Sequence, residues 1–257
     1  MILDEIVAHK KAELAQRLRR RAAGVVAAAA EHAPEPPDFR AALRRPGLSI
    51  IAEIKGASPS AGTIRGGFDA VSVARAYEAG GAAALSVLTD AKYFHGSWES
   101  LASVARAVRL PVLCKEFVID PYQIDEARAA GAAAVLLIAS LLEGSLRSYL
   151  RQAGHRGLAP LVEVHTPDEV ALALDAGADM IGINNRDLRT LQVDLGTTAR
   201  LRPLIPPGVV VVSESGFERR EQVQQVERLG VDAILVGTSL MASGEPVAKL
   251  RELRGAS

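Results

Sequence analysis

The chain has 257 residues, which suits one large domain or two small ones and excludes a minimal scaffold held together by disulfides or metal. Hydrophobic residues make up 49% and charged residues 23%, so the chain can bury a sizeable core. Lys plus Arg (30) balances Asp plus Glu (30), and a net charge of +0 excludes a global field that would hold nucleic acid or an anionic membrane. We therefore expect any anion to be bound locally.

Cysteine usage and the N-terminal residues indicate the compartment and the kind of site. Cys114 is the one cysteine, which excludes an intramolecular disulfide and a thiolate metal cluster. The N-terminus lacks a continuous apolar segment, and no stretch approaches the ~18 apolar residues of a membrane span. The five histidines show no pair at metal-ligand spacing. We expect a cytoplasmic protein without a metal site.

Residues 1–45 differ from the rest and are predicted to form a helical N-terminal extension. Prolines at positions 34, 36 and 37 end the helical pattern. The apolar face expected for the extension consists of Ile2, Ile6, Val7, Leu14 and Leu18.

From Leu48 onward, short apolar runs alternate with longer segments of helical spacing, which is typical of repeated βα units. The runs are Leu48–Lys55, Ala83–Leu88, Pro111–Phe117, Ala132–Ile138, Leu158–His165, Asp179–Asn184, Val209–Glu214 and Asp232–Gly237. Eight parallel strands over this length predict a (β/α)8 barrel, a TIM barrel, with residues 1–257 as a single domain. A doubly wound open sheet is the alternative, but no Gly-x-Gly-x-x-Gly turn follows the first run.

Turn and cap residues support this register. A glycine at positions 80, 131, 177 and 230 is expected just past the end of a helix. Asp120-Pro121 and Thr166-Pro167 are expected to begin helices, the second with a capping box that Glu169 completes.

Charged and amide side chains stand near the C-terminal ends of several runs, where barrel enzymes build their active sites. They are Glu53, Lys55, Lys115, Glu163, Asn184 and Glu214. The period of two in a strand predicts that all of them face inward. A structural layer of salt bridges is the alternative for any one of them, but a shared inward register favours an active site.

Small residues after the last two runs indicate a phosphate site. Ser215-Gly216 and Gly237-Thr238-Ser239 offer backbone N–H groups and hydroxyls beside short helix starts. Gly62–Gly67 follows the first run and is interpreted either as a mobile lid or as an ordinary surface loop.

Several other side chains have simpler interpretations. Phe94 and Phe117 can contact a flat apolar part of a ligand, whereas Tyr93 can equally pack in the core. Ser58 and Ser60 are interpreted as ligand-binding or lid positions, since no histidine partner lies near them in sequence. Cys114 is expected to face the helices, and His165 is given no catalytic role.

Six segments together resemble the indole-3-glycerol phosphate synthase family over essentially the whole chain. They are Ile51–Ser60, Leu88–Ser97, Cys114–Ile124, Leu161–His165, Ile181–Leu188 and Ser213–Gly216. The resemblance implies a (β/α)8 enzyme without cofactor or metal. It also implies conversion of 1-(2-carboxyphenylamino)-1-deoxyribulose 5-phosphate to indole-3-glycerol phosphate, with release of carbon dioxide and water.

The resemblance further implies roles for matching residues. Lys115 acts as general acid toward the ribulose carbonyl, Glu163 as acid/base in the dehydration, and Lys55 binds the substrate carboxylate. The supporting and binding residues implied are Glu53, Asn184 and Glu214 for orientation; Pro59, Phe94 and Phe117 for the aromatic ring; Arg186 for the sugar; and Lys55, Ser215, Gly216, Gly237 and Ser239 for the phosphate.

Two alternatives stay open. Other phosphate-binding barrels of tryptophan and histidine biosynthesis, such as phosphoribosylanthranilate isomerase, fit poorly because their acid/base pairs would be Cys/Asp, Asp/Asp or Glu/Asp. A non-catalytic barrel that binds a phosphorylated metabolite is disfavoured by the presence of both Lys115 and Glu163. The expected partner is a small phosphorylated substrate, and the expected state is a monomer or weak homo-oligomer.

Overall fold

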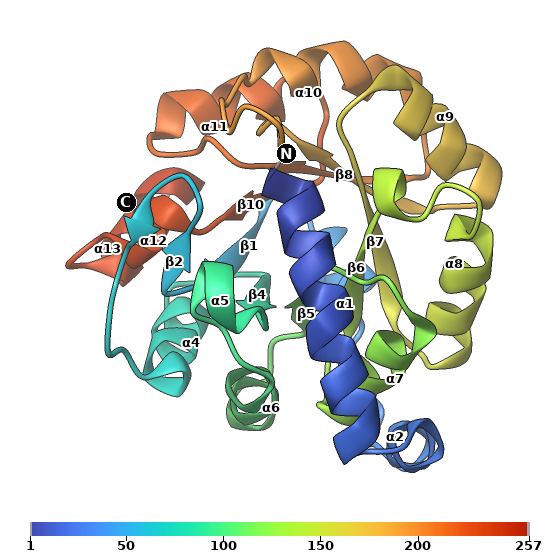
Figure 1. The fold of residues 1–257 in the computed structure, drawn as a ribbon. Helices are drawn as coiled ribbons and strands as arrows, with labels where there is room; N and C mark the ends of the chain where they lie inside the picture. The colour runs from blue at the N-terminus through green and yellow to red at the C-terminus, as the bar shows by residue number, and fades with distance from the viewer. Residues whose placement is uncertain (1, 256–257) are drawn as a thin grey trace.

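A computed structural model describes residues 2–255 and contains a closed barrel of eight parallel strands surrounded by helices (Figure 1). Neighbouring strands follow the order β1-β10-β9-β8-β7-β6-β5-β4 around the barrel. The strands are β1 (Ser49–Ile54), β4 (Ala84–Leu88), β5 (Val112–Lys115), β6 (Ala134–Ile138), β7 (Ala159–Val164), β8 (Met180–Asn184), β9 (Val210–Glu214) and β10 (Ala233–Val236). The prediction of a (β/α)8 barrel with an N-terminal helical extension is confirmed.

Each strand lies within one of the eight predicted runs and is shorter than that run. Both faces of a barrel strand are buried, which is why the runs are almost continuously apolar. Ile51 and Leu113 belong to the cluster inside the barrel, whereas Ala52 and Cys114 belong to the cluster between the strands and the helices. The outward orientation expected for Cys114 is thus confirmed.

Helices follow the strands and cover the outside of the barrel (Figure 1). They are α4 (Ala70–Ala79), α5 (Ala91–Phe94), α6 (Trp98–Ala107), α7 (Pro121–Ala129), α8 (Leu146–His155), α9 (Pro167–Ala176), α10 (Gly196–Leu201), α11 (Arg220–Glu227), α12 (Thr238–Met241) and α13 (Pro246–Arg254), with single 3-10 turns at Ala139–Leu141 and Arg202–Leu204.

The helix ends largely follow the predicted signals. Glycines 131, 177 and 230 have positive φ, but after α4 the helical φ of −73° at Gly80 moves the left-handed residue to Gly81. Asp120 and Thr166 cap α7 and α9 as expected. The capping box predicted at Thr166 does not form, because the Glu169 carboxylate accepts from the backbone N–H of His165 instead. A capping box does form at Asp120 with Gln123.

The N-terminal extension contains α1 (Ile2–Arg20), α2 (Ala23–Glu31) and the short α3 (Phe39–Leu43). Helix α1 lies across the end of the barrel at the C-terminal ends of the strands, which we call the mouth, and α2 packs against α7 (Figure 1). The buried residues of α1 are Ile6, Lys10 and Leu14. The prediction of Leu18 in the apolar face is wrong, because the buried stripe turns away from it and leaves it 36% exposed.

The segment after β1 forms a small antiparallel hairpin of β2 (Ala57–Ser58) and β3 (Gly62–Thr63). The β3 residues are exposed and the β2 residues are buried. Among the described residues, no helix combines the length and the apolar character needed to cross a membrane.

Candidate active site

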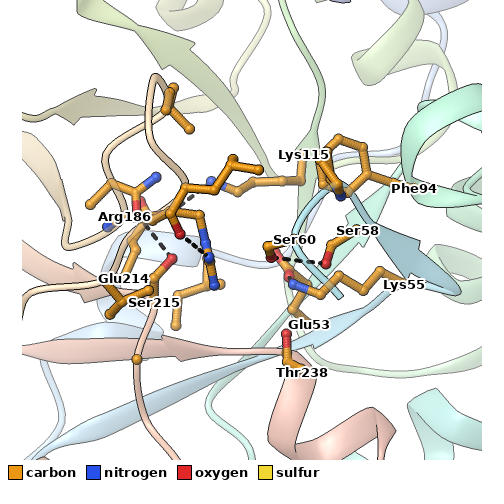
Figure 2. A pocket seen from close by; sticks show the side chains of 18 of the residues that line it. Glu53, Lys55, Ser58, Ser60, Phe94, Lys115, Arg186, Glu214, Ser215 and Thr238 are labelled. Carbon is orange, nitrogen blue, oxygen red and sulfur yellow. Dashed lines mark hydrogen bonds and ion pairs between the residues drawn. The ribbon is translucent and has the colours of Figure 1, made fainter. Parts of the chain in front are cut away.

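A cavity of about 620 Å³ opens at the mouth of the barrel (Figure 2). Every residue that the sequence pointed to for the site lines this cavity: Glu53, Lys55, Ser58, Pro59, Phe94, Lys115, Phe117, Glu163, Asn184, Arg186, Glu214, Ser215, Gly216, Gly237 and Ser239. The inward register predicted for the six charged and amide residues therefore agrees with the geometry. Their chemical roles stay predictions.

Lys115, at the end of β5, is held between two carboxylates. Its Nζ lies 2.7 Å from Oε2 of Glu163, at β7, and 2.7 Å from Oε2 of Glu214, at β9. Both glutamates are almost completely buried. Burial would lower the pKa of Lys115, but Glu163, Glu214 and Glu53 outweigh it and raise that pKa. Lys115 is therefore an ammonium at neutral pH.

The two glutamates differ in charge state although they share Lys115. Burial raises the pKa of Glu214 to about 7, with Lys115 opposing the rise and Glu163 adding to it. Burial acts in the same direction on Glu163, but Lys115, His165 and the amide of Asn184 outweigh it and lower that pKa. Glu163 is thus a carboxylate at neutral pH, whereas Glu214 binds a proton much more readily.

A second ion pair lies at the end of β1, where Lys55 Nζ contacts Glu53 Oε1 at 2.6 Å. Ser86 donates weakly to the other Glu53 oxygen at 3.4 Å. Figure 2 shows Glu53 and Lys55 close to Thr238, on the side of the cavity away from Glu214 and Ser215. A Cβ at Gly237 would collide with Glu53 Oε1, so a glycine is needed there for this pair to fit.

Asn184 connects Glu163 to the segments after β8 and β9. Its Nδ2 donates to Glu163 at 3.1 Å, and its Oδ1 accepts from the Ser215 hydroxyl at 2.9 Å and from the Arg186 backbone N–H at 3.0 Å. The Arg186 guanidinium donates to the Leu191 carbonyl at 2.7 Å, which folds the segment after β8 over the cavity.

His165 contacts Glu163 without lining the cavity. Its Nε2 lies 3.4 Å from Glu163 Oε1, and its Nδ1 lies 3.2 Å from Glu169 Oε2. Burial lowers the pKa of His165, but the hydrogen bond with Glu169 and the charge of Glu163 together raise it. The ring therefore supports the ionised form of Glu163 from the side opposite Lys115.

The apolar wall of the cavity contains Phe94 and Phe117, whose ring centroids are 5.9 Å apart. Ile2, Leu3 and Ile6 of α1 complete this wall. These three could not be assigned to the site from the sequence, since their spacing only predicts an amphipathic helix and not the surface it covers.

The turns after β9 and β10 also line the cavity. Ser215 and Gly216 both have left-handed backbones, with φ of 70° and 94°. The Ser215 and Ser239 hydroxyls already donate to Asn184 and to the Phe217 carbonyl. Backbone N–H groups of these turns are consequently better candidates for an anion than the hydroxyls are. Thr238, the middle residue of the predicted Gly237-Thr238-Ser239 turn, lines the cavity as well.

Comparison with known proteins finds a family whose model matches nearly the whole chain. Residues 3–253 match the family model of indole-3-glycerol phosphate synthase. The chain belongs to the indole-3-glycerol phosphate synthase family. Relatives with that name include one from Mycobacterium avium (strain 104), 47% identical over 98% of this chain and 93% of its own length. Another, from Dehalococcoides mccartyi (strain CBDB1), is 45% identical over 98% of this chain and 100% of its own length.

Solved structures at low identity show the fold alone. A tryptophan synthase α-subunit mutant from Pyrococcus furiosus has a TM-score of 0.62 at 17% identity, covering 80% of this chain and 98% of its own. A 3-hexulose-6-phosphate synthase from Salmonella typhimurium has a TM-score of 0.66 at 15% identity, covering 81% and 97%. Family membership makes the chain an enzyme, a carboxy-lyase of tryptophan biosynthesis.

Proposed function

We propose that the cavity binds 1-(2-carboxyphenylamino)-1-deoxyribulose 5-phosphate and converts it to indole-3-glycerol phosphate, carbon dioxide and water. The observation that carries the proposal is the Lys115 ammonium, held 2.7 Å from both Glu163 and Glu214 on the floor of the cavity. An apolar wall suits the aromatic ring at one end, and the glycine turns suit the phosphate at the other.

In the first step the ring carbon that bears the carboxylate attacks the ribulose carbonyl carbon. Lys115 donates a proton to the carbonyl oxygen, so no alkoxide has to form as the carbon–carbon bond is made. Loss of carbon dioxide then returns the bond electrons to the ring and restores its aromaticity. Glu163 and Glu214 keep Lys115 protonated and aimed into the cavity before the substrate arrives.

The second step removes water. The new hydroxyl leaves with a proton, and a proton is lost from the neighbouring methylene, which forms the indole double bond. Glu163 is assigned to take the methylene proton, because it is ionised at rest. It can pass that proton across their hydrogen bond to Lys115, which the first step has left as a neutral amine. Asn184 and His165 hold its other oxygen in place.

Lys55 is assigned to the negative groups of the substrate. Its ammonium is paired with Glu53 and lies beside Gly237, at the end of the cavity proposed for phosphate. From this place the Lys55 ammonium can contact the phosphate or the carboxylate of the substrate.

The proposal is tested by adding the substrate to purified protein and following indole fluorescence. Lys115→Met and Glu163→Gln should lower kcat by ~10²- to 10⁴-fold, the usual range for a lost general acid or base. Lys249→Ala, on the outer helix α13, is the matched control and should turn over like the parent. Equal rates for the parent and both site variants would overturn the assigned roles.

Two finer expectations belong to this proposal. The chain works in the cytoplasm, supported by its one, fully buried thiol, and as a monomer or weak homo-oligomer. Light scattering at micromolar protein, with and without phosphate, tests the second expectation; a stable large assembly would contradict it.

A further inference from the structure

Helix α1 carries a lysine that is completely buried. Lys10 has no exposed side-chain surface, and its Nζ lies 2.9 Å from Asp90 Oδ2 and 3.1 Å from Glu116 Oε1. Both carboxylates have fully buried side chains as well. Glu13, on the same helix and partly exposed, contacts the ammonium at 2.8 Å. We call Lys10, Asp90 and Glu116 the buried ion cluster.

The two carboxylates of the cluster belong to the segments that carry Phe94 and Phe117, the aromatic residues of the apolar wall. Asp90 caps α5, with its Oδ1 accepting from the backbone N–H of Tyr93 at 2.7 Å, next to Phe94. Glu116 Oε1 accepts from the backbone N–H of Phe117 at 2.7 Å. Each carboxylate therefore joins Lys10 to the backbone beside one of the two phenylalanines.

The charges explain why the ammonium matters. Without it, two carboxylates would be buried at the same place with no cation between them, which is strongly unfavourable. Thr89 donates to Glu116 Oε2 at 2.7 Å, but a neutral hydroxyl does not replace a charge. The segments after β4 and β5 would have to separate or one carboxylate would have to bind a proton.

The same helix supplies part of the cavity wall. Ile2, Leu3 and Ile6 line the cavity, and Ile6 precedes Lys10 by one helical turn. Figure 1 shows α1 crossing in front of β5, with α5 beside it. The ring of His9 also meets Tyr93 edge-on at 5.9 Å. The Lys10 ammonium thus joins three segments of the apolar wall: α1, α5 and the segment after β5.

We propose that Lys10 is a positioning residue for the synthase reaction, which fixes the apolar wall by joining α1 to Asp90 and Glu116. The inference rests on the proposed function of the cavity for its kinetic effect. It does not rest on it for the structural effect, which is the ordering of residues 90–94 and 116–118.

The kinetic test compares Lys10→Met with the parent. A displaced wall loosens the hold on the ring, so KM for the substrate should rise about tenfold and kcat/KM should fall ~10- to 100-fold. Adding Glu116→Gln removes one of the two uncompensated charges and their mutual repulsion, so the double variant should regain part of the lost kcat/KM. A Lys10→Met protein within twofold of the parent, or a double variant no better than the single one, would overturn the inference.

The matched control is Arg17→Gln, seven residues further along α1. Arg17 pairs with Glu126 of α7 at 3.2 Å and with Glu13 of α1 at 3.5 Å, but it has no ion pair with Asp90 or Glu116 and does not line the cavity. It should lower the Tm and leave KM as in the parent. A KM rise equal to that of Lys10→Met would show a general effect of loosening α1 and would contradict a specific role for Lys10.

Amide hydrogen exchange gives a reading that needs no turnover. Exchange over residues 90–94 and 116–118 should be faster in Lys10→Met than in the parent and unchanged in Arg17→Gln. If Lys10→Met does not fold, Thr89→Val, which removes the hydroxyl on Glu116, should show the same faster exchange with a smaller KM rise. Unchanged exchange in a folded variant would overturn the inference, whereas a parent without turnover would overturn only the proposed function.

Discussion

Lys115 stands between two glutamates of unequal proton affinity, and this inequality is the chemical feature of the site. Burial raises the pKa of both glutamates, but Lys115 and His165 outweigh it at Glu163, whereas the negative charge of Glu163 adds to it at Glu214. A protonated lysine and an ionised carboxylate therefore touch each other in the resting protein.

A glycine beside the other ion pair gives a prediction at the same scale. Gly237→Ala places a methyl group against Glu53 Oε1 and 3.0 Å from Lys55 Nζ, so the pair must move. We expect kcat/KM to fall at least tenfold, with little change in the far-UV circular dichroism spectrum.

Gly244→Ala is the control, because a Cβ at that position would have nothing within 4 Å. Its kcat/KM should equal that of the parent. Full activity in Gly237→Ala would show that the Lys55–Glu53 geometry is not needed for turnover.

Most of these side chains could be predicted from the sequence, but not all. Glu53, Lys115 and Glu163 were predictable because charged residues are unusual in strands that are buried on both faces. Their positions near the strand ends also place all three side chains on the inward face. Lys10 was not predictable, because a lysine among the other charges of an amphipathic helix has the pattern of a solvated face. Only its partners in the segments after β4 and β5, Asp90 and Glu116, explain its burial.

At the scale of elements, α1 is attached to the barrel through charged groups as well as apolar ones. Arg17 of α1 contacts Glu126 of α7 at 3.2 Å, and its guanidinium lies 5.1 Å from the centroid of the Trp98 ring. Burial raises the pKa of Glu126 to about 7, although Arg17 lowers it. The contact between the extension and α7 is therefore sensitive to pH.

The direction of that dependence follows from the raised pKa. Below pH 4.5, Glu126 is protonated in both the folded and the unfolded chain, and its contribution to stability is fully present. As the pH rises through about 7, this contribution is lost, because the unfolded chain ionises more easily. Glu126→Gln, which cannot ionise, should gain free energy of unfolding relative to the parent between pH 5 and 8, on the order of 1 kcal/mol.

Urea unfolding of both proteins at the two pH values measures this difference. Glu221→Gln, on the exposed side of α11, serves as the control for removing a carboxylate. Identical pH slopes for the parent and Glu126→Gln would contradict the raised pKa.

The elements themselves were largely predictable from periodicity and caps. The eight predicted runs contain the eight strands of the barrel, because a strand that is buried on both faces consists almost entirely of apolar residues. The hairpin β2–β3 was not predicted, because two-residue strands have no period to detect. The capping box assigned to Thr166 failed because Glu169 had a competing partner in His165.

At the scale of the whole molecule, the site exists only when the barrel is closed. Its side chains come from β1, β5, β7, β8, β9 and the turn after β10, and α1 adds part of the wall. An unfolded chain cannot bring these groups together, so a ligand of the cavity binds the folded state alone.

This linkage predicts stabilisation by the product. Indole-3-glycerol phosphate at 100 times its Kd should raise the free energy of unfolding by about 2.7 kcal/mol, and the Tm with it. Glycerol at the same concentration, lacking both ring and phosphate, should leave the Tm unchanged. An unchanged Tm in the presence of the product would contradict product binding in this cavity.

The proposed reaction is tested most directly by adding 1-(2-carboxyphenylamino)-1-deoxyribulose 5-phosphate to the parent protein. Carbon dioxide and the indole product are then measured in the same sample. The chemistry assigned to Lys115 and Glu163 predicts one carbon dioxide for each indole formed, and loss of both in Lys115→Met. Consumption of substrate without carbon dioxide, or a folded protein that binds substrate and forms neither product, would contradict it.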